Sequence, residues 1–164
     1  MSVQLCAPQA LTISHDVRSF NCGEPVLDDW LVRRALNNQS SGASRTFVVS
    51  DQNNCVYGYY ALAAGAVAHQ LAISSVRRNM PDPIPVVVLA RLAVDQRAQG
   101  LKRGAALLQD AVKRAMTVSQ HAGARALLVH ALHERAQSFY EHYGFRSSPI
   151  QPGTLMLRLN VGQP

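Results

Sequence analysis

The stretch Val86-Val-Val-Leu-Ala-Arg-Leu-Ala-Val94 decides the fold of this chain. It is almost continuously apolar and rich in β-branched side chains, which is typical of a strand buried on both faces of a sheet. The loop that follows, Asp95-Gln-Arg-Ala-Gln-Gly-Leu-Lys-Arg-Gly104, is polar and basic. From Gly104 onward, apolar residues recur at helical spacing until Gly123. A buried strand that leads directly into a long amphipathic helix indicates an α/β fold.

The flanking sequence predicts further helices and strands, separated by turn residues. In chain order these are a helix over Gly23–Asn38, strands over Arg45–Val49 and Val56–Leu62, a proline-rich loop over Arg77–Pro85, a strand over Ala126–Ala131, a helix over Glu134–Tyr143 and a strand over Thr154–Leu159. Strand, helix and strand in the second half imply a right-handed crossover in a mixed sheet covered by helices. We therefore expect one domain over residues 1–164.

The charge of the chain suggests an anionic partner. Sixteen basic residues outnumber ten acidic ones, and the basic set holds 14 Arg and 2 Lys. A guanidinium can form two parallel hydrogen bonds to phosphate oxygens, so the bias favours phosphate-rich ligands, although a GC-rich genome would produce the same bias.

The remaining composition argues against several classes of protein. The three cysteines have no paired spacing, and no apolar run approaches the length of a membrane span. The six histidines lack the spacing of a metal site. We expect a cytoplasmic protein without a signal peptide, a membrane segment or a bound metal.

The loop Asp95–Gly104 is the first candidate site. Its glycines let the backbone approach a ligand closely, the following helix presents unpaired N–H groups, and Arg97, Lys102 and Arg103 add positive charge. These features outline a diphosphate cradle, but an ordinary strand-to-helix turn with solvated basic residues is the other interpretation.

Tyr140 is the second candidate. A neutral tyrosine, with an ordinary pKa of about 10, can donate a proton to a departing thiolate whose pKa is about 8.5. Its neighbours Phe139, Tyr143 and Phe145 also allow a purely structural role for this ring, in packing the helix onto the sheet.

The order of these motifs resembles the GNAT family of acetyl-CoA-dependent N-acetyltransferases. The segments that carry the resemblance are Arg91-Leu-Ala-Val-Asp95, the basic loop, the long helix and Ala136-Gln-Ser-Phe-Tyr-Glu-His-Tyr-Gly-Phe145. Four more segments are similar to the GNAT toxins of type II toxin-antitoxin modules, the TacT/AtaT-like group. They are Phe20-Asn-Cys-Gly-Glu24, Ser44-Arg-Thr-Phe47, Gly58-Tyr-Tyr-Ala-Leu62 and Arg78-Asn-Met-Pro-Asp-Pro-Ile-Pro-Val86.

The resemblance implies that the chain acetylates the α-amine of aminoacyl-tRNA and thereby blocks translation. It also implies a ribbon-helix-helix antitoxin, operator DNA bound only by the toxin-antitoxin complex, and a possible homodimer. Tyr140 would be the general acid, and no metal is needed. The residues expected to bind acetyl-CoA are Leu92, Ala93, Val94, Arg97, Gln99, Gly100, Lys102, Arg103, Gly104 and Ala105.

One departure concerns the family signature Arg/Gln-x-x-Gly-x-Gly/Ala. Starting from Gln99, Lys102 occupies the first glycine position and Gly104 the second; starting from Arg97, Gly100 fits but Lys102 occupies the small-residue position. A positive φ at Lys102 would cost about 1 to 2 kcal/mol.

Arginines outside the loop are candidates for tRNA phosphates, with Arg77 and Arg78 as the first choices, although an exposed helix arginine is more often a solvated surface charge. They are Arg33, Arg34, Arg45, Arg77 and Arg78. Two other functions stay open: a GNAT enzyme that acts on protein or small-molecule amines, and a non-catalytic basic module that binds nucleic acid.

Overall fold

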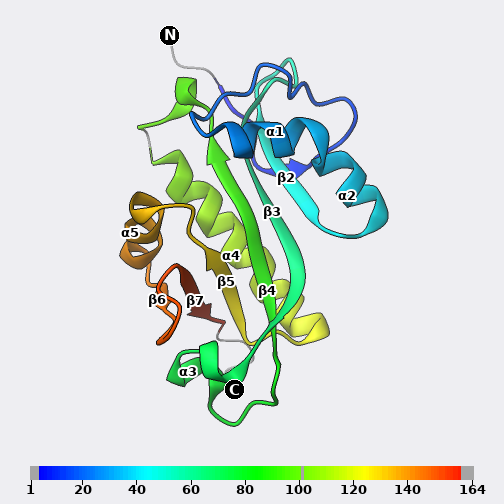
Figure 1. The fold of residues 1–164 in the computed structure, drawn as a ribbon. Coiled ribbons are helices and arrows are strands. Elements are labelled where there is room, and N and C mark those ends of the chain that lie inside the picture. The colour runs from blue at the N-terminus through cyan, green and yellow to red at the C-terminus, as the bar shows by residue number, and fades with distance from the viewer. Residues whose placement is uncertain (1–3, 101, 160–164) are drawn as a thin grey trace. The chain divides into compact units, whose positions relative to one another are not determined.

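The computed structural model describes residues 4–100 and 102–159. The strands of the described chain form one seven-stranded sheet in the order β1-β2-β3-β4-β5-β7-β6 (Figure 1). They are β1 (Gln9–Ala10), β2 (Arg45–Ser50), β3 (Val56–Val67), β4 (Ile84–Val94), β5 (Ala126–His130), β6 (Arg146–Ser147) and β7 (Thr154–Arg158). β4 and β5 are parallel, whereas β5 and β7 are antiparallel. The predicted α/β fold with a mixed sheet is confirmed. The apolar stretch Val86–Val94 lies in β4, which is the central strand of the sheet.

Five α-helices and two short 3₁₀-helices occur in the described chain. They are α1 (Pro25–Arg33), α2 (Ala35–Ser41), η1 (His69–Leu71), α3 (Ser74–Arg77), η2 (Gln96–Ala98), α4 (Arg103–Ala122) and α5 (Glu134–His142). The chain divides into two compact units, the first formed by Met1–Ala63 with Arg91–Ala111 and the second by Ala64–Ala90 with Val112–Pro164. No described helix is long and apolar enough to span a membrane.

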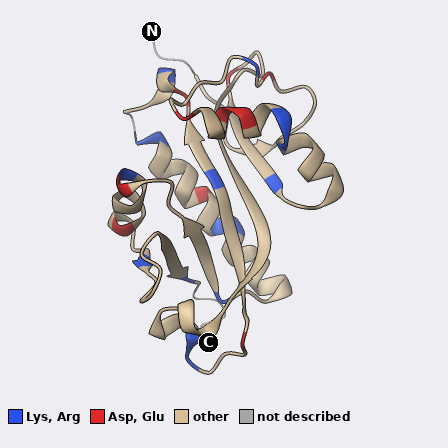
Figure 2. Ribbon diagram, in the orientation of Figure 1, with Lys and Arg blue, Asp and Glu red and all other residues tan. Residues whose placement is uncertain are grey.

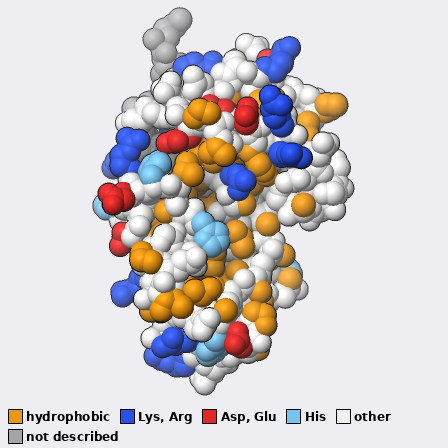
Figure 3. All heavy atoms as spheres, viewed as in Figure 1, with side chains coloured by type: hydrophobic (Ala, Val, Ile, Leu, Met, Phe, Trp, Pro, Cys, Tyr) orange, Lys and Arg blue, Asp and Glu red, His pale blue; other side chains and the backbone are white. Residues whose placement is uncertain are grey.

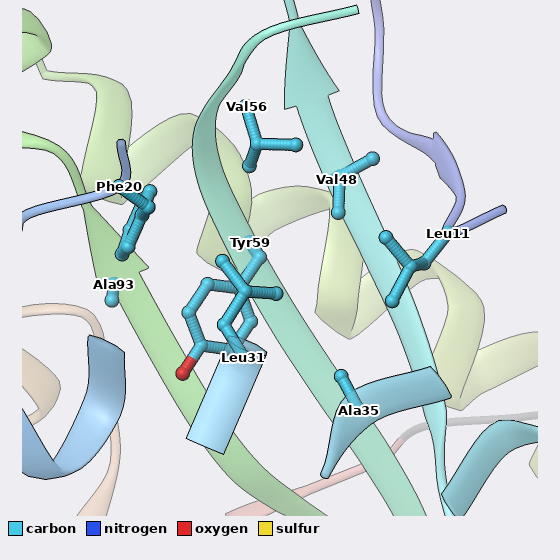
Figure 4. Packing of buried hydrophobic residues seen from close by; sticks show 8 residues of the cluster. All are labelled: Leu11, Phe20, Leu31, Ala35, Val48, Val56, Tyr59 and Ala93. Carbon is cyan, nitrogen blue, oxygen red and sulfur yellow. The ribbon is translucent and has the colours of Figure 1, made fainter. Parts of the chain in front are cut away.

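The core of the first unit lies between α1, α2 and the antiparallel pair β2 and β3 (Figure 4). Leu31 and Ala35 pack on Val48 and Tyr59, which are register partners on β2 and β3. The Tyr59 ring stacks on Trp30, with 6.0 Å between centroids, and its hydroxyl donates a hydrogen bond to a helix carbonyl. Ala93, near the end of β4, belongs to the same cluster, so this core reaches the strand that leads into the candidate loop.

The single helix predicted over Gly23–Asn38 is wrong in one respect, because the structure has two helices with a break at Arg34. The second helix continues beyond the predicted end at Asn38 to Ser41, and Gly42 caps it with a φ of 85°, which suits glycine. The Gln39 side chain anchors this second helix. It donates a hydrogen bond to the Leu11 carbonyl at 2.6 Å and accepts one from Thr46 N at 2.8 Å, so α2 is tied to distant parts of the chain.

The core of the second unit lies where β5 pairs with β7 and where α3 covers the sheet. Ala126, Leu128 and Met156 pack with Val76 and Ile84. β6 extends this side of the sheet by pairing with β7, and α5 contacts both strands (Figure 1).

The loop predicted over Arg77–Pro85 is shorter than expected. Arg77 ends α3 and β4 already begins at Ile84, because the fully buried Ile84 side chain belongs to the core of the second unit. Within the remaining loop, the Asp82 side chain accepts a hydrogen bond from His69 N at 3.0 Å, which ties the loop to η1. β3 likewise continues to Val67, beyond its predicted end at Leu62.

Candidate active site

Asp95 organises the loop that follows β4. Its side chain is 1% exposed and accepts four hydrogen bonds. Oδ1 receives Arg97 N at 2.9 Å and Arg97 Nε at 2.8 Å, while Oδ2 receives Arg97 Nη2 at 2.9 Å and Asn21 N at 2.8 Å. The carboxylate thus caps η2 and ties the loop to a segment near the start of the first unit.

Electrostatics stabilise this arrangement. Burial by itself would raise the pKa of Asp95, but the hydrogen bonds from Arg97 and from the Asn21 backbone outweigh it and hold the pKa below the ordinary value. The hydrogen bonds between the side chains of Arg97 and Asp95 raise the pKa of Arg97. The Arg97 guanidinium also lies 4.4 Å from the centre of the Tyr57 ring. The structure therefore uses Arg97, a predicted cofactor ligand, to fix the loop internally, although its side chain is still 44% exposed.

The segment Asn21–Gly23 packs against the loop and was not predicted as part of the site. Gln96 N donates to the Asn21 carbonyl at 2.9 Å. The Gln99 side chain bridges the carbonyls of Cys22 and Val94, at 3.1 and 2.8 Å. At Gly23, whose φ is 94°, an added Cβ would come within 2.9 Å of the Gln96 side chain. The signal in the sequence was Phe20-Asn-Cys-Gly-Glu24, which resembled the toxin group but had no role assigned.

The turn into α4 uses backbone conformations that suit close approach of a ligand. Gly100 has φ 89°, and an added Cβ there would meet no atom within 4 Å. Lys102 has φ 57°, so the strained conformation considered from the signature is present. Arg103 has a buried Nε with no hydrogen-bond partner among the described residues. An unpaired buried guanidinium nitrogen beside a helix start suits an anionic ligand.

The ten predicted cofactor residues follow one another along the first unit, from the end of β4 to the first turn of α4. Ala93 is buried and belongs to the core, and Gly58 on β3 lies so close that an added Cβ would be 3.5 Å from the Ala93 carbonyl oxygen. The Val94 carbonyl already accepts the Gln99 amide. The Gln99 side chain therefore forms its hydrogen bonds within the protein, and a ligand would contact the main-chain N–H of this residue.

Tyr140 lies on α5 in the second unit and is 6% exposed. Its ring meets Phe139 and Phe145, with centroids 5.2 and 5.3 Å away. Tyr140 is thus part of an aromatic core, as the structural interpretation expected. Burial raises the pKa of its phenol, so the hydroxyl keeps its proton at neutral and mildly alkaline pH. This protonation state is the one that a general acid needs.

The three cysteines form no disulfide, and Cys22 is not a ready nucleophile. Burial, followed by the influence of Asp28, raises the pKa of the Cys22 thiol to about 12. The described residues contain no group of three or more His, Cys, Asp or Glu side chains arranged to hold a metal ion.

The five arginines proposed for tRNA fall into two groups. Arg33, Arg34 and Arg45 are exposed in the first unit, where Arg33 Nε lies 3.7 Å from Asp29. Arg77 and Arg78, at the end of α3 in the second unit, line a pocket. Figure 2 shows basic positions at this end of the second unit.

Comparison with known proteins gives a consistent result. The family model described as an acetyltransferase (GNAT) domain matches residues 42–147. The tRNA-acetylating toxin of Mycobacterium tuberculosis is 51% identical over 151 residues, which cover 92% of this chain and 90% of the relative.

Solved structures of toxins are also similar. AtaT complexed with acetyl-methionyl-tRNAfMet is 28% identical, with a TM-score of 0.86 and coverage of 94% of this chain and 95% of that one. A tyrosine-to-phenylalanine mutant of KacT is 25% identical, with a TM-score of 0.88 and the same two coverages of 94% and 95%. A similar mutant of AtaT, bound to acetyl-CoA and the C-terminus of the antitoxin AtaR, is 26% identical, with a TM-score of 0.80 and coverage of 94% and 92%. The AtaT-AtaR complex bound to DNA is 28% identical, with a TM-score of 0.76 and coverage of 93% and 94%.

Proposed function

Since this chain belongs to the GNAT family of acetyltransferases, we propose that it transfers the acetyl group of acetyl-CoA to the α-amine of the amino acid on a charged tRNA. The observation that carries the proposal is the 51% identity, over 92% of the chain, to a tRNA-acetylating toxin. Acetylation converts the amine into an amide, which can no longer act as the nucleophile in peptide-bond formation.

Acetyl-CoA would bind along the segment from Leu92 to Ala105. The diphosphate would rest on the main-chain N–H groups around Gly100 and the start of α4, where the helix dipole favours negative charge. The unpaired Arg103 Nε and the exposed Lys102 would supply the counter-charge. The pantetheine arm would run beside the end of β4, where main-chain groups of Leu92–Val94 can pair with its amides and a backbone N–H can stabilise the oxyanion.

In this reaction the α-amine attacks the thioester carbonyl, so that a C–N bond forms and the C–S bond breaks. The amine loses a proton to solvent, and the Tyr140 hydroxyl gives one to the departing thiolate. Burial raises the pKa of Tyr140, so its hydroxyl holds the proton until the thiolate departs. The similar toxin structures include tyrosine-to-phenylalanine mutants of KacT and AtaT, and the choice of Tyr140 in this chain rests on the segment Ala136–Phe145 that resembles the family. A direct transfer needs no acyl-enzyme, because holding amine and thioester together lowers the entropic barrier.

The protein would act as a toxin in the cytoplasm, where charged tRNA is found. Its partner would be a ribbon-helix-helix antitoxin that covers the active site, and the joint complex would bind operator DNA. The similar AtaT structures with AtaR, and with AtaR and DNA, support these partners. We further expect residues 1–164 to act as a single catalytic domain, with a homodimer as the candidate assembly.

The proposal is tested by comparing amine acceptors. Purified protein is given acetyl-CoA together with charged tRNA, a lysine-rich peptide or spermidine, and the free thiol of CoA is measured. We expect kcat/KM for charged tRNA to exceed that for the other amines by at least a factor of 100. Transfer to the peptide or to spermidine at equal efficiency would instead assign the chain to protein or small-molecule amines. Absence of transfer and of acetyl-CoA binding would indicate a non-catalytic module.

A further inference from the structure

A pocket of about 900 Å³ lies within the second unit, between the end of α3 and the turn from α5 into β6. Its lining includes the three arginines Arg77, Arg78 and Arg146, and Glu141 is the one acidic residue in it. We call it the α3 pocket. Its volume falls within the range of pockets that hold small organic ligands. Figure 3 shows basic side chains gathered at the lower end of the visible face, over α3.

The α3 pocket keeps an excess of positive charge, with three arginines against one glutamate. Arg77, Arg78 and Arg146 form no ion pair with any residue in the ranges 4–100 and 102–159. Arg125 adds a fourth positive charge behind the wall. Burial lowers the pKa of Arg125, and the nearby charges of Arg158 and Arg78 lower it further, which shows that these guanidinium groups repel one another. Such a cluster is stabilised when an anion binds.

The wall of the pocket is also held in place from inside. The Arg125 guanidinium donates hydrogen bonds to the carbonyl oxygens of Ser75, Val76 and Arg78, at 3.2, 3.1 and 3.1 Å. All three acceptors are neutral, so Arg125 fixes the end of α3 without cancelling its charge. On the opposite wall, the Gln137 amide donates to Ser147 Oγ at 3.5 Å. The pocket therefore presents its arginines from two fixed segments.

The chemistry of the lining favours phosphate over a protein ligand. Besides the arginines it offers hydroxyl groups of Ser74, Ser75 and Ser147, and phosphate oxygens in nucleic acids are contacted mainly by such groups. Phe145 and Ala72 in the lining are almost completely buried, so its accessible apolar side chains are the half-buried Ile73 and the exposed Pro149. The pocket thus offers no accessible aromatic side chain of the kind that commonly anchors a bound protein.

We propose that the α3 pocket binds backbone phosphodiesters of the tRNA substrate and so positions it by charge rather than by base sequence. This inference rests on the proposed function, since it assigns a second contact to the same substrate. Operator DNA carries the same phosphodiester chemistry, so the experiment must separate the two nucleic acids.

The test uses the double variant Arg78→Gln/Arg146→Gln, which removes two exposed charges and keeps polar side chains. Arg135→Gln is the matched control, because Arg135 is an exposed arginine of α5 that does not line the pocket. Two readouts are needed. The first is the kinetics of acetyl transfer to charged tRNA at several salt concentrations. The second is fluorescence anisotropy, of uncharged tRNA with the purified protein and of operator DNA with the toxin-antitoxin complex.

For the double variant we expect KM for charged tRNA to rise about tenfold or more, with kcat and KM for acetyl-CoA unchanged. The slope of log affinity against log salt should fall by about 1.4 to 1.8, because each of the two lost phosphate contacts contributes about 0.7 to 0.9. Arg135→Gln should match the wild type. Uncharged tRNA should lose affinity in parallel, and this readout tests the pocket even if no acetylation occurs.

If the double variant keeps the KM, the salt slope and the tRNA affinity of the wild type, the pocket assignment is wrong and the acetyltransferase proposal still stands. Loss of affinity for operator DNA alone would also overturn it, in favour of DNA. If the wild type binds tRNA more tightly than the double variant does but transfers no acetyl group to it, the result would contradict the proposed function and support the pocket.

Discussion

The substitution Asp95→Asn tests how the loop after β4 is held. In the wild type each carboxylate oxygen accepts two hydrogen bonds. Asparagine keeps one acceptor oxygen and replaces the other with an NH₂ group. In either orientation of the amide, that NH₂ faces two N–H donors, which come from Arg97 alone or from Arg97 and Asn21. The substitution therefore removes two charge-assisted hydrogen bonds and brings donors against donors.

The expected magnitude follows from these contacts. Hydrogen bonds to a charged group contribute about 1.5 to 3 kcal/mol each. Because the Arg97 side chain is 44% exposed, water recovers part of its loss. We therefore expect the free energy of unfolding to fall by about 2 to 4 kcal/mol, in line with the loss of one member of a largely buried ion pair. The affinity for acetyl-CoA should fall about tenfold or more, because the loop that would cradle the diphosphate loses its anchor.

The assay is urea unfolding followed by circular dichroism, together with calorimetric titration of acetyl-CoA. Asp29→Asn is the matched control, since Asp29 also faces an arginine, Arg33, but their side chains are 71% and 75% exposed. That variant should lose less than about 0.5 kcal/mol. A loss below 0.5 kcal/mol for Asp95→Asn, with normal acetyl-CoA affinity, would refute the reasoning. A large loss of stability with unchanged affinity would show that Asp95 supports the fold without shaping the binding loop.

Three further outcomes are expected. Tyr140→Phe should lower kcat about 10²- to 10⁴-fold with little change in the free energy of unfolding. Tyr143→Phe, at the same end of the helix, should leave kcat unchanged. Equal kcat values for the two variants would remove Tyr140 from the mechanism. Lys102→Gly should raise the free energy of unfolding by about 0.5 to 1 kcal/mol, because glycine relieves the φ of 57°, and it should weaken acetyl-CoA binding. Asn54→Gly is the control, since asparagine tolerates its φ of 63°. A lower free energy of unfolding for Lys102→Gly would contradict the strain at this residue. The stability difference between wild type and Asp95→Asn should be complete above pH 3.8, the ordinary aspartate pKa, and should shrink as pH falls through the lower pKa of folded Asp95; a difference that grows on acidification would reverse the sign of that shift.

The elements that the sequence predicted well are those with a strong local pattern. The long helix, expected from Gly104 to the stop at Gly123, is α4, because its buried side chains Leu108, Ala111 and Ala115 recur at helical spacing. The apolar strand before it needed no other part of the chain to be recognised, and it is the central strand of the sheet.

The elements that were missed depend on distant partners. The two-residue strands β1 and β6 exist only through pairing with β2 and β7, so they leave no periodic signal. The separate helix α2 is anchored by the Gln39 side chain, which bonds to residues on other segments. Intrinsic helix propensity contains no information about such contacts.

The same distinction applies to the candidate site. Glycines and basic residues outlined the loop because their backbone and charge properties are local. The part played by Asp95 was not predicted, because one of its donors, Asn21 N, lies 74 residues away in the sequence. The local pair of Asp95 and Arg97, at the end of a buried strand, was the available signal, since an acid in that position needs a partner.

The central claim is most directly tested by identifying the acetylated product. The protein is incubated with acetyl-CoA and charged tRNA, the tRNA is digested with nuclease, and the terminal adenosine esters are analysed by mass spectrometry. We predict an N-acetyl-aminoacyl adenosine, absent when the tRNA is uncharged or when the α-amine is already formylated. Acetyl groups found on nucleobases or ribose, or acetylation of the formylated tRNA, would contradict transfer to the α-amine.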